Sequence, residues 1–600
     1  MRFGLFAFIL FIFASFNLQA QIQLGYLNYS QKRQHLRTTD VDSAQLELPF
    51  WDDFSTSYLF PDTSLWVNSQ NVNIQTGIGI LPPSINVAVF DGADQYGNPY
   101  SSQPTAEGIG DSLVSRFINL SDAGQASTYL SFYYQKEGLG ELPDENDFLR
   151  LLIKDTNNEW TEVWRISGSD LEENDEFFYE SILIDLPEYF HEYFQFKFES
   201  FGRLSGDFDT WNVDYIYLNE NRSGDRLDLS DHTILTHPTS IFKAYTSVPY
   251  DQFMSDPEMY LNTTSFDMMN IEAEETNIES TVIIKDRVQN SVIDTVEFER
   301  ELDNNINPFE VVSFTSSIIQ PDNFLDLEDS LYLSTFVYIN TLDTIDIVNL
   351  RVNDTVTTEF SIHEDLAYDD GTAEFTSGLN SYGGQIAYRF YTPIEDQITG
   401  MKIYFPNVST QSGGSTFEIK VWDELSNEGN NEIYSQSVTR QNAIGFNEFS
   451  TYYFNKKVTV QDTFYIGFQQ LSEGFFVVGY DKNTSSGSEI FFNTGFVWEP
   501  NTDLQGSLMI RPIFGDPGEI ITGLPEIHEK ITVFPNPSEG IFKFSDPVRI
   551  LSVYDSFGRK IRTTYNRADR IIDLTGQSKG IYFVLLYDGE REWTEKLILK

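Results

Sequence analysis

The segment FQFKFE at residues 194–199 decides the fold class of this chain. Its three phenylalanines alternate with Gln195, Lys197 and Glu199, so one side of the segment is apolar and the other is polar. This period of two is typical of a β-strand with one buried face. Residues 211–217 repeat the pattern, and other strand-length runs lie at 129–134, 148–153 and 159–164. These strands predict a two-sheet jelly roll or a similar sandwich.

Strand-like segments continue to the C-terminus and predict an all-β, multi-domain chain of tandem β-sandwiches. Residues 21–47 are polar, and we expect them to form a linker or a loosely docked arm. The larger expected domains are a jelly roll at residues 48–220, an Ig-like β-sandwich spacer at 221–365 and a second jelly-roll-like domain at 366–515. Turn-forming Pro and Gly residues predict a linker at 516–529, followed by a small all-β module at 530–600.

The N-terminus has the three regions of a secretory signal peptide. Arg2 precedes an almost wholly apolar run at residues 3–16, and small Ala20 follows shortly after it. This pattern predicts a signal peptide at residues 1–20, cleaved after Ala20. The apolar run is shorter than the roughly 20 residues that span a bilayer. We therefore expect a secreted mature chain without a transmembrane helix.

Charge separates the last module from the rest of the chain. The net charge is −53, from 38 basic and 91 acidic residues. Residues 525–600 contain 12 basic and 11 acidic residues, so almost all of the excess acid precedes them. Such an asymmetry indicates parts with different roles. The acidic part would repel nucleic acid phosphates, so a nucleic acid partner is not expected.

The last 70 residues contain a series of short motifs, which are the following residues in order: Pro535, Asn536, Pro537, Gly540, Asp555, Gly558, Lys560, Gly580, Tyr582, Lys596 and Lys600. In this order they resemble the C-terminal sorting domain (type A) of the type IX secretion system of Bacteroidetes-type bacteria. An ordinary C-terminal immunoglobulin-like module is the alternative. The resemblance implies that the secretion machinery and a sortase are partners. It also implies attachment to a surface glycolipid, and a location at the cell surface or outside the cell.

Two acidic stretches in residues 48–220 suggest a metal site. Residues 49–54 and 206–216 resemble the ends of MAM-like and concanavalin-like jelly rolls, in which the first and last strands lie close together. These stretches contain five aspartates, which are Asp52, Asp53, Asp207, Asp209 and Asp214. Calcium binds six to eight oxygens in irregular geometry, so we expect these carboxylates to converge on a structural calcium ion. The alternative is a set of separate, hydrated turn residues.

No catalytic residue can be assigned from the sequence. The chain has no cysteine, so thiol nucleophiles and disulfides are excluded, and its six histidines form no HExxH motif. Paired carboxylates such as Asp369-Asp370 are the remaining basis for hydrolysis, but 91 acidic residues make such pairs common. Four aromatic residues are suited either to stacking on sugars or to core packing, namely Trp66, Trp422, Tyr480 and Trp498.

We therefore expect a cell-surface or secreted protein with a non-enzymatic adhesive or glycan-binding role, whose ligand is a glycan or a protein. The alternative is a secreted, glycosidase-like hydrolase or its accessory subunit. Carboxylates that face a pocket, one of them with a raised pKa, would favour the enzyme. A shallow aromatic strip without them would favour glycan binding.

Six Asp-(Ser/Thr)-apolar tripeptides resemble the O-glycosylation motif of Bacteroidetes-type bacteria. Their hydroxyl residues are Ser43, Ser112, Thr295, Ser330, Thr344 and Thr355. Four lie between residues 221 and 365, where glycans would coat a spacer. The alternative is that these tripeptides begin β-strands in an Asp-rich protein.

Overall fold

The computed structural model describes most of the chain between residues 22 and 600. The described residues are 22–25, 45–57, 59–67, 72–94, 97–170, 176–289, 291–297, 305–324, 331–341, 343, 348–406, 415–426, 431–441, 447–495, 497–515, 533–544, 549–555, 559–561, 564–566, 571–587 and 592–600. The expected signal peptide at 1–20 and linker at 516–529 lie outside them. The chain divides into two compact units, Met1–Gly518 and Glu519–Lys600.

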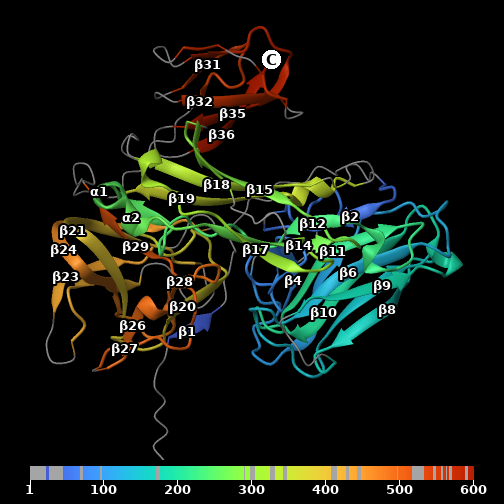
Figure 1. The fold of residues 1–600 in the computed structure, drawn as a ribbon, viewed down its shortest axis with the longest axis horizontal. Coiled ribbons are helices and arrows are strands. Elements are labelled where there is room, and N and C mark those ends of the chain that lie inside the picture. Colours follow the sequence, from blue (N-terminus) through green and yellow to red (C-terminus); the bar gives the residue numbers. More distant parts are fainter. Residues whose placement is uncertain are drawn as a thin grey trace, which may run out of the picture. The chain divides into compact units, whose positions relative to one another are not determined.

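Strands dominate both units, which confirms the predicted all-β fold (Figure 1). The helices that the structure describes are short: α1 (Tyr250–Ser255), α2 (Pro257–Tyr260) and the 3-10 turns η1 (Pro187–Tyr189), η2 (Arg226–Asp228), η3 (Pro321–Phe324), η4 (Leu350–Asn353) and η5 (Gly487–Glu489). None of these helices has the length and apolar character needed to cross a membrane.

The first sandwich of the large unit contains two antiparallel sheets. One sheet has the order β5 (Glu107–Val114), β10 (Gln195–Arg203), β7 (Phe148–Lys154), β8 (Trp160–Ser167). The other has the order β3 (Asn73–Gln75), β4 (Val87–Phe90), β11 (Trp211–Asn219), β6 (Tyr129–Lys136), β9 (Phe178–Leu183), with β2 (Phe50–Asp52) also paired to β11. Aromatic rings pack edge to face between the two sheets. The ring centroids of Phe198 on β10 and Phe132 on β6 are 4.7 Å apart. The alternating phenylalanines therefore form the core that their period predicts.

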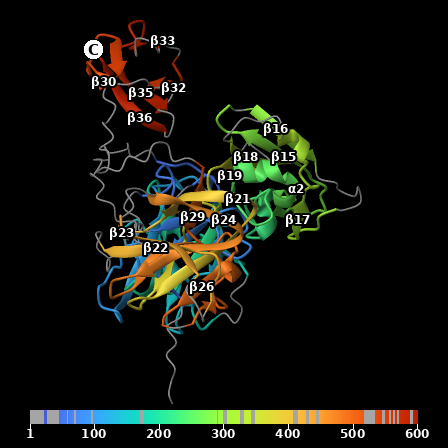
Figure 2. The ribbon, with the colours of Figure 1, turned by 90° about the vertical axis from the view of Figure 1, so that its left-hand side faces the viewer.

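Residues 231–363 form two smaller sheets. The first is β12 (Asp231–Ile234), β14 (Ser265–Ile271), β17 (Val311–Thr315). The second is β13 (Ser247–Pro249), β19 (Thr355–His363), β18 (Leu331–Asn340), β15 (Glu279–Asp286), β16 (Ser291–Glu297), and Figure 2 shows its last four strands side by side. β14 alternates between buried and half-buried residues, which places Phe266 and Met268 in the core.

Two further sheets follow in the large unit. The longer one has the order β23 (Glu432–Thr439), β22 (Thr416–Trp422), β24 (Ser450–Gln470), β21 (Gln385–Ile403), β26 (Ile490–Asn493), β27 (Glu499–Pro500), with β29 (Ile510–Phe514) also paired to β21. The shorter one has the order β1 (Gln23–Gly25), β20 (Phe375–Leu379), β25 (Phe476–Asp481), β28 (Ser507–Leu508). β1 comes from the N-terminal segment, and the polar composition of residues 21–47 does not predict this strand.

The C-terminal unit also has two antiparallel sheets. One is β30 (Val533–Phe534), β31 (Ile541–Phe544), β34 (Ile571–Asp573), β33 (Thr564–Asn566), and the other is β32 (Arg549–Asp555), β35 (Gly580–Tyr587), β36 (Glu592–Leu599). Phe542, Ile572 and Val584 are fully buried in the core that these sheets form.

The motif residues of this unit have distinct structural roles. Asn536 donates through its amide to the Lys596 carbonyl at 2.6 Å and accepts from the Ile598 amide at 2.9 Å, so it fixes the start of the unit to β36. Gly540 has φ of +135°, and a Cβ there would lie 2.5 Å from Thr575 Cγ2. Tyr582 is buried. Exposed motif residues are Pro535, Pro537, Lys560, Gly580, Lys596 and Lys600, whereas Gly558 and the side chain of Asp555 lie outside the described residues.

Candidate functional site

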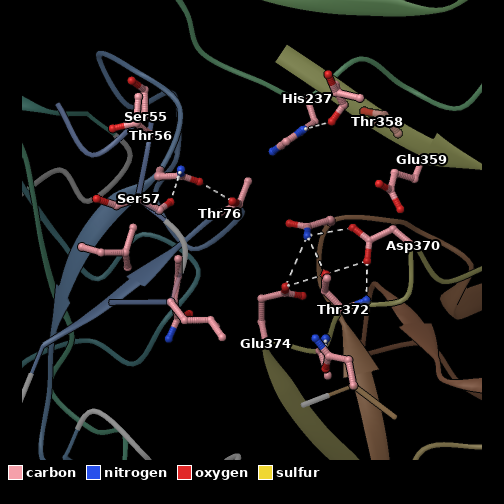
Figure 3. Close-up of a pocket in the computed structure, with 18 residues that line it drawn as sticks. Ser55, Thr56, Ser57, Thr76, His237, Thr358, Glu359, Asp370, Thr372 and Glu374 are labelled. Atoms are coloured by element: carbon pink, nitrogen blue, oxygen red, sulfur yellow. Dashed lines mark hydrogen bonds between the residues drawn. The ribbon is translucent and has the colours of Figure 1, made fainter. Parts of the chain in front are cut away.

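A pocket of about 600 Å³ opens in the large unit, where segments distant in the sequence meet (Figure 3). One wall comes from residues 55–57, 59, 74–76 and 86 of the first sandwich. The facing wall comes from residues 370 and 372–374 together with Asn447 and Asn483, and the rim comes from His237 and residues 357–359. Most of the lining residues carry a hydroxyl, an amide or a carboxyl group.

The acidic wall is built on the turn sequence DDGTAE at residues 369–374. Asp370 Oδ1 accepts hydrogen bonds from the Thr372 backbone amide at 2.8 Å and the Thr372 hydroxyl at 2.6 Å. Gly371 permits this tight turn because its φ is +94°, a value that residues with a Cβ rarely adopt. The turn thus aims the Asp370 side chain into the pocket (Figure 3).

Asn483 holds the two carboxylates of this wall together. Its amide nitrogen donates to Asp370 Oδ2 at 3.0 Å and to Glu374 Oε1 at 3.2 Å. Glu374 Oε2 also accepts from the Lys482 backbone amide at 2.7 Å. Asp481 lies behind the wall and accepts from the Asp370 amide at 2.8 Å. Because the same donor serves both side chains, Asp370 and Glu374 form one fixed polar surface.

The environment of the acidic wall favours protonated carboxyl groups. Burial raises the pKa of Glu374 to about 8, and repulsion from Asp370 adds to this effect. Burial, followed by repulsion from Asp370 and Glu374, also raises the pKa of Asp481 well above its ordinary value. At neutral pH Glu374 therefore carries a proton and can both donate and accept hydrogen bonds.

The facing wall is neutral. Asn86 donates to the carbonyls of Phe54 and Ser57, both at 3.2 Å, and its side-chain oxygen accepts from the Thr76 hydroxyl. Ser57 differs from these residues because its hydroxyl oxygen is buried and has no hydrogen-bond partner among the residues that the structure describes. Buried polar groups are rarely left unpaired in proteins. The Ser57 hydroxyl is therefore suited to receive a ligand.

Carboxylates line this pocket on one side only. Figure 3 shows Asp370 and Glu374 on the same wall, with Glu359 above them at the rim. Glu359 is exposed and pairs with Arg287 at 2.6 Å. The lining residues of the facing wall include no acid. Asp370 and Glu374, the second with a raised pKa, are the pocket-facing carboxyl groups that an enzyme would need. Their placement on one wall differs from that of a typical glycosidase, whose two carboxyl groups lie on either side of the bond that it cleaves.

The five aspartates of the expected calcium site lie in several surroundings. Asp52 accepts from Trp66 Nε1 at 2.6 Å and from the Phe54 amide at 2.9 Å, and its burial raises its pKa to about 7. Asp53 accepts from Asn353 at 2.9 Å. Asp214 accepts from the Ser84 amide at 2.9 Å, and its pKa is raised well above the ordinary value by burial and then by Asp53. Asp53 and Asp214 thus interact, while Asp52 faces the core.

The two remaining aspartates have other acidic neighbours. Burial raises the pKa of Asp207 well above its ordinary value, and repulsion from Asp91 and Asp94 raises this pKa further. Asp209 groups with Asp144 and Asp147. The other acidic group with metal-ligand spacing in the described part of the chain is His232, Glu272 and Asp343. The sequence interpretation did not select Asp144 and Asp147, although their spacing in the turn sequence PDEND at 143–147 was a usable signal.

The aromatic candidates for sugar stacking are mostly core residues. Trp66, Trp422 and Tyr480 are at most 3 % exposed. Trp498 is half-buried and packs edge-on against Trp422 at 5.4 Å. Of the expected glycosylation sites, Thr295 and Thr355 are exposed and Ser112 is half-buried. Ser43, Ser330 and Thr344 lie outside the described residues.

Comparison with known families identifies the end of the chain. Residues 532–600 match the family described as the secretion system C-terminal sorting domain. The chain is therefore a type IX secretion cargo, and its tail directs export to the cell surface or the extracellular space. No curated protein matches the chain.

Solved structures show only distant likeness. The glycoside hydrolase domain of Endo-D from Streptococcus pneumoniae R6 is 9 % identical, with a TM-score of 0.19 over 49 % of this chain and 37 % of that one. A β-glucuronidase from Bacteroides uniformis is 12 % identical, with a TM-score of 0.18 over 48 % of this chain and 31 % of that one. The CBM22 tandem of Xyn10C from Paenibacillus barcinonensis is 8 % identical, with a TM-score of 0.18 over 78 % of this chain and 97 % of that one. The chain thus spans about a third of the length of these hydrolases.

Proposed function

We propose that this type IX cargo is an adhesive or glycan-binding protein of the cell surface, and that the pocket between Ser57 and Glu374 binds a carbohydrate without cleaving it. The observation that carries the proposal is the one-sided placement of the carboxylates opposite a neutral, hydroxyl-rich wall. A volume of about 600 Å³ lies within the range of small-molecule sites. A sugar presents hydroxyls on both faces, and each hydroxyl both donates and accepts.

The groups of the pocket suit such a ligand. Asp370 accepts hydrogen bonds, protonated Glu374 donates or accepts, and the free Ser57 hydroxyl can do both. Hydrogen bonds within the protein already orient Asp370, Glu374 and Asn86. A ligand would therefore bind without paying the full entropic cost of ordering these side chains.

A glycan array probed with the full chain tests this proposal. Asp370→Asn and Ser57→Ala should each weaken the strongest signal by about tenfold, because a hydrogen bond in such a site contributes about 1–2 kcal/mol. Thr105→Val is a matched control, since Thr105 is an exposed hydroxyl residue away from the pocket. Equal binding by the parent chain and its three variants would show that the glycan does not bind in this pocket. An array without any signal would contradict glycan binding itself.

A carboxylate-dependent hydrolase is the second candidate function. The raised pKa of Glu374, about 8, favours it, because a general acid must keep its proton near neutral pH. A screen of glycoside substrates with the full chain separates the candidates. The enzymatic role would be supported if the parent chain hydrolyses a glycoside and if this turnover falls at least a hundredfold in Glu374→Gln while binding persists.

We also propose that a sortase removes the C-terminal unit and joins the cargo to a surface glycolipid. The exposed Pro535, Pro537, Lys560, Lys596 and Lys600 of the sorting domain support contact with such partners. Mass spectrometry of the surface-borne protein should find a C-terminus within residues 516–529. Intact Lys600 on most copies would contradict cleavage.

A further inference from the structure

Three aspartates of the first sandwich form a compact cluster away from the pocket. Asp144 and Asp147 lie in the loop between β6 and β7, and Asp209 lies in the loop between β10 and β11. One carboxylate oxygen of each residue lies within 4.8 Å of the others. Asp147 and Asp209 are each 4 % exposed, whereas Asp144 is exposed at the mouth of the cluster.

The protein satisfies only part of this cluster. Asp147 Oδ2 accepts from the Asp144 amide at 2.8 Å, and Asp209 Oδ2 accepts from the Arg203 amide at 2.6 Å. The second oxygen of Asp209, Oδ1, is buried and has no hydrogen-bond partner among the described residues. A buried carboxylate oxygen without a donor is costly to the fold unless an ion or a proton binds it. Because no described donor reaches it, this oxygen points to a ligand, which is either a cation or a proton shared with the neighbouring Asp147 carboxyl group.

The charges around the cluster leave an excess of acid. Burial raises the pKa of Asp209, and the backbone amide and charge of Arg203 offset only part of this rise. The Arg203 guanidinium also pairs with Glu141 at 2.6 Å. Burial raises the pKa of Asp147 to about 7, and repulsion from Asp209 adds to this rise. Asp209 and Glu141 thus share this guanidinium, while Asp144 and Asp147 add further acidic groups beside it. A bound cation would relieve the repulsion that remains.

We propose that Asp144, Asp147 and Asp209 bind a calcium ion. All the donors are oxygens, which suits calcium and disfavours zinc, since zinc prefers nitrogen and sulfur. Calcium needs six to eight oxygens and tolerates irregular geometry, and water can complete its shell at the exposed Asp144 side. The ion would tie the β6–β7 loop to the β10–β11 loop. This site is independent of the carbohydrate proposal, because none of its residues lines the pocket.

Calcium titration of the full chain, first stripped of metal with chelator, tests the proposal. We expect calorimetry with calcium chloride to show one binding site fewer in Asp209→Asn, and at least tenfold weaker affinity at that site in Asp144→Asn. Asp144 is exposed, so its variant should fold even if Asp209→Asn does not. Asp185→Asn, an exposed aspartate in the same sandwich, is the matched control and should titrate like the parent chain.

Thermal melting distinguishes an ion from a shared proton. In chelator, Asp209→Asn should melt at or above the temperature of the parent chain, because the substitution removes repulsion. In millimolar calcium the parent chain should melt several degrees higher, and the shift should shrink in both cluster variants. Equal titrations in the parent chain and both variants would overturn the proposal. So would stabilisation by acid with no response to calcium, which is the behaviour of a proton held between the carboxylates.

Discussion

The pocket wall at Asp370 and Glu374 and the cluster at Asp144, Asp147 and Asp209 contain the same chemical groups but compensate them differently. In the wall, Asn483 donates to both carboxylates, and backbone amides occupy further oxygens. In the cluster, one buried oxygen of Asp209 has no donor within the described protein. A carboxyl group whose oxygens are held by protein donors is oriented to recognise a neutral polar ligand. A carboxylate with a buried oxygen that lacks a donor needs a cation. The difference lies in the donors around the acids and not in the number of acids.

Removal of the shared donor would convert the first arrangement into the second. Asn483→Leu leaves Asp370 and Glu374 without their common amide, and we expect it to lower the free energy of unfolding by about 2 kcal/mol, because it removes two hydrogen bonds of about 1 kcal/mol each. Urea denaturation of the full chain measures the loss.

The matched control for this variant is Asn157→Leu. Asn157 is exposed like Asn483, but its side-chain amide donates to one carboxylate only, that of the turn residue Asp155, at 3.3 Å, so its loss should cost less than about 0.5 kcal/mol. Equal costs for the two substitutions would show that Asn483 does not compensate the wall.

The pH dependence of stability separates the two regions. The raised pKa values of Glu374, about 8, and Asp147, about 7, mean that the folded chain binds more protons than the unfolded chain between about pH 4 and pH 8. The free energy of unfolding should therefore fall as the pH rises through this range. Because each group is partly screened, we expect a loss of about 2 kcal/mol from each.

Calcium should change only one of these contributions. In chelator, both Glu374→Gln and Asp147→Asn should flatten the dependence on pH. In millimolar calcium the ion replaces the proton at Asp147, so the remaining slope should respond to Glu374→Gln alone. Denaturation at several pH values, with and without calcium, measures these slopes. A rise in stability from pH 4 to pH 8 in chelator would contradict the assignment of raised pKa values.

The fold followed from a local pattern, because a period of two places alternate side chains on opposite faces of a strand. Phe196 and Phe198 are fully buried, as this period predicts. The opposite face is less exposed than expected, since Glu199 is only 6 % exposed. Arg150 and Lys197 cover it through ion pairs. The pair between Arg150 on β7 and Glu199 on β10 depends on the register of the two strands, which the pattern of one strand does not contain.

The sites could be predicted only in part, because they join distant segments. Asp52 and Asp53 are adjacent in the sequence, but alternation at the end of β2 turns Asp52 toward Trp66 and Asp53 toward Asn353. Asp209 was recognised as a metal candidate, yet its neighbours Asp144 and Asp147 come from another loop. The pocket draws on segments from Ser55 to Asn483, and no local motif links them.

The smallest expected change in stability concerns Ser57 and sharpens the contrast within the pocket. Its hydroxyl oxygen is buried but makes no hydrogen bond among the described residues, so Ser57→Ala breaks no internal bond. Removal of an unpaired buried polar group is neutral or favourable, and the free energy of unfolding should change by less than about 0.5 kcal/mol. Carbohydrate affinity should nevertheless fall about tenfold, since the hydroxyl would pair with the ligand. Denaturation and binding measured on the same preparation give both values. A clear loss of stability with unchanged affinity would mean that Ser57 supports the fold instead of receiving a ligand.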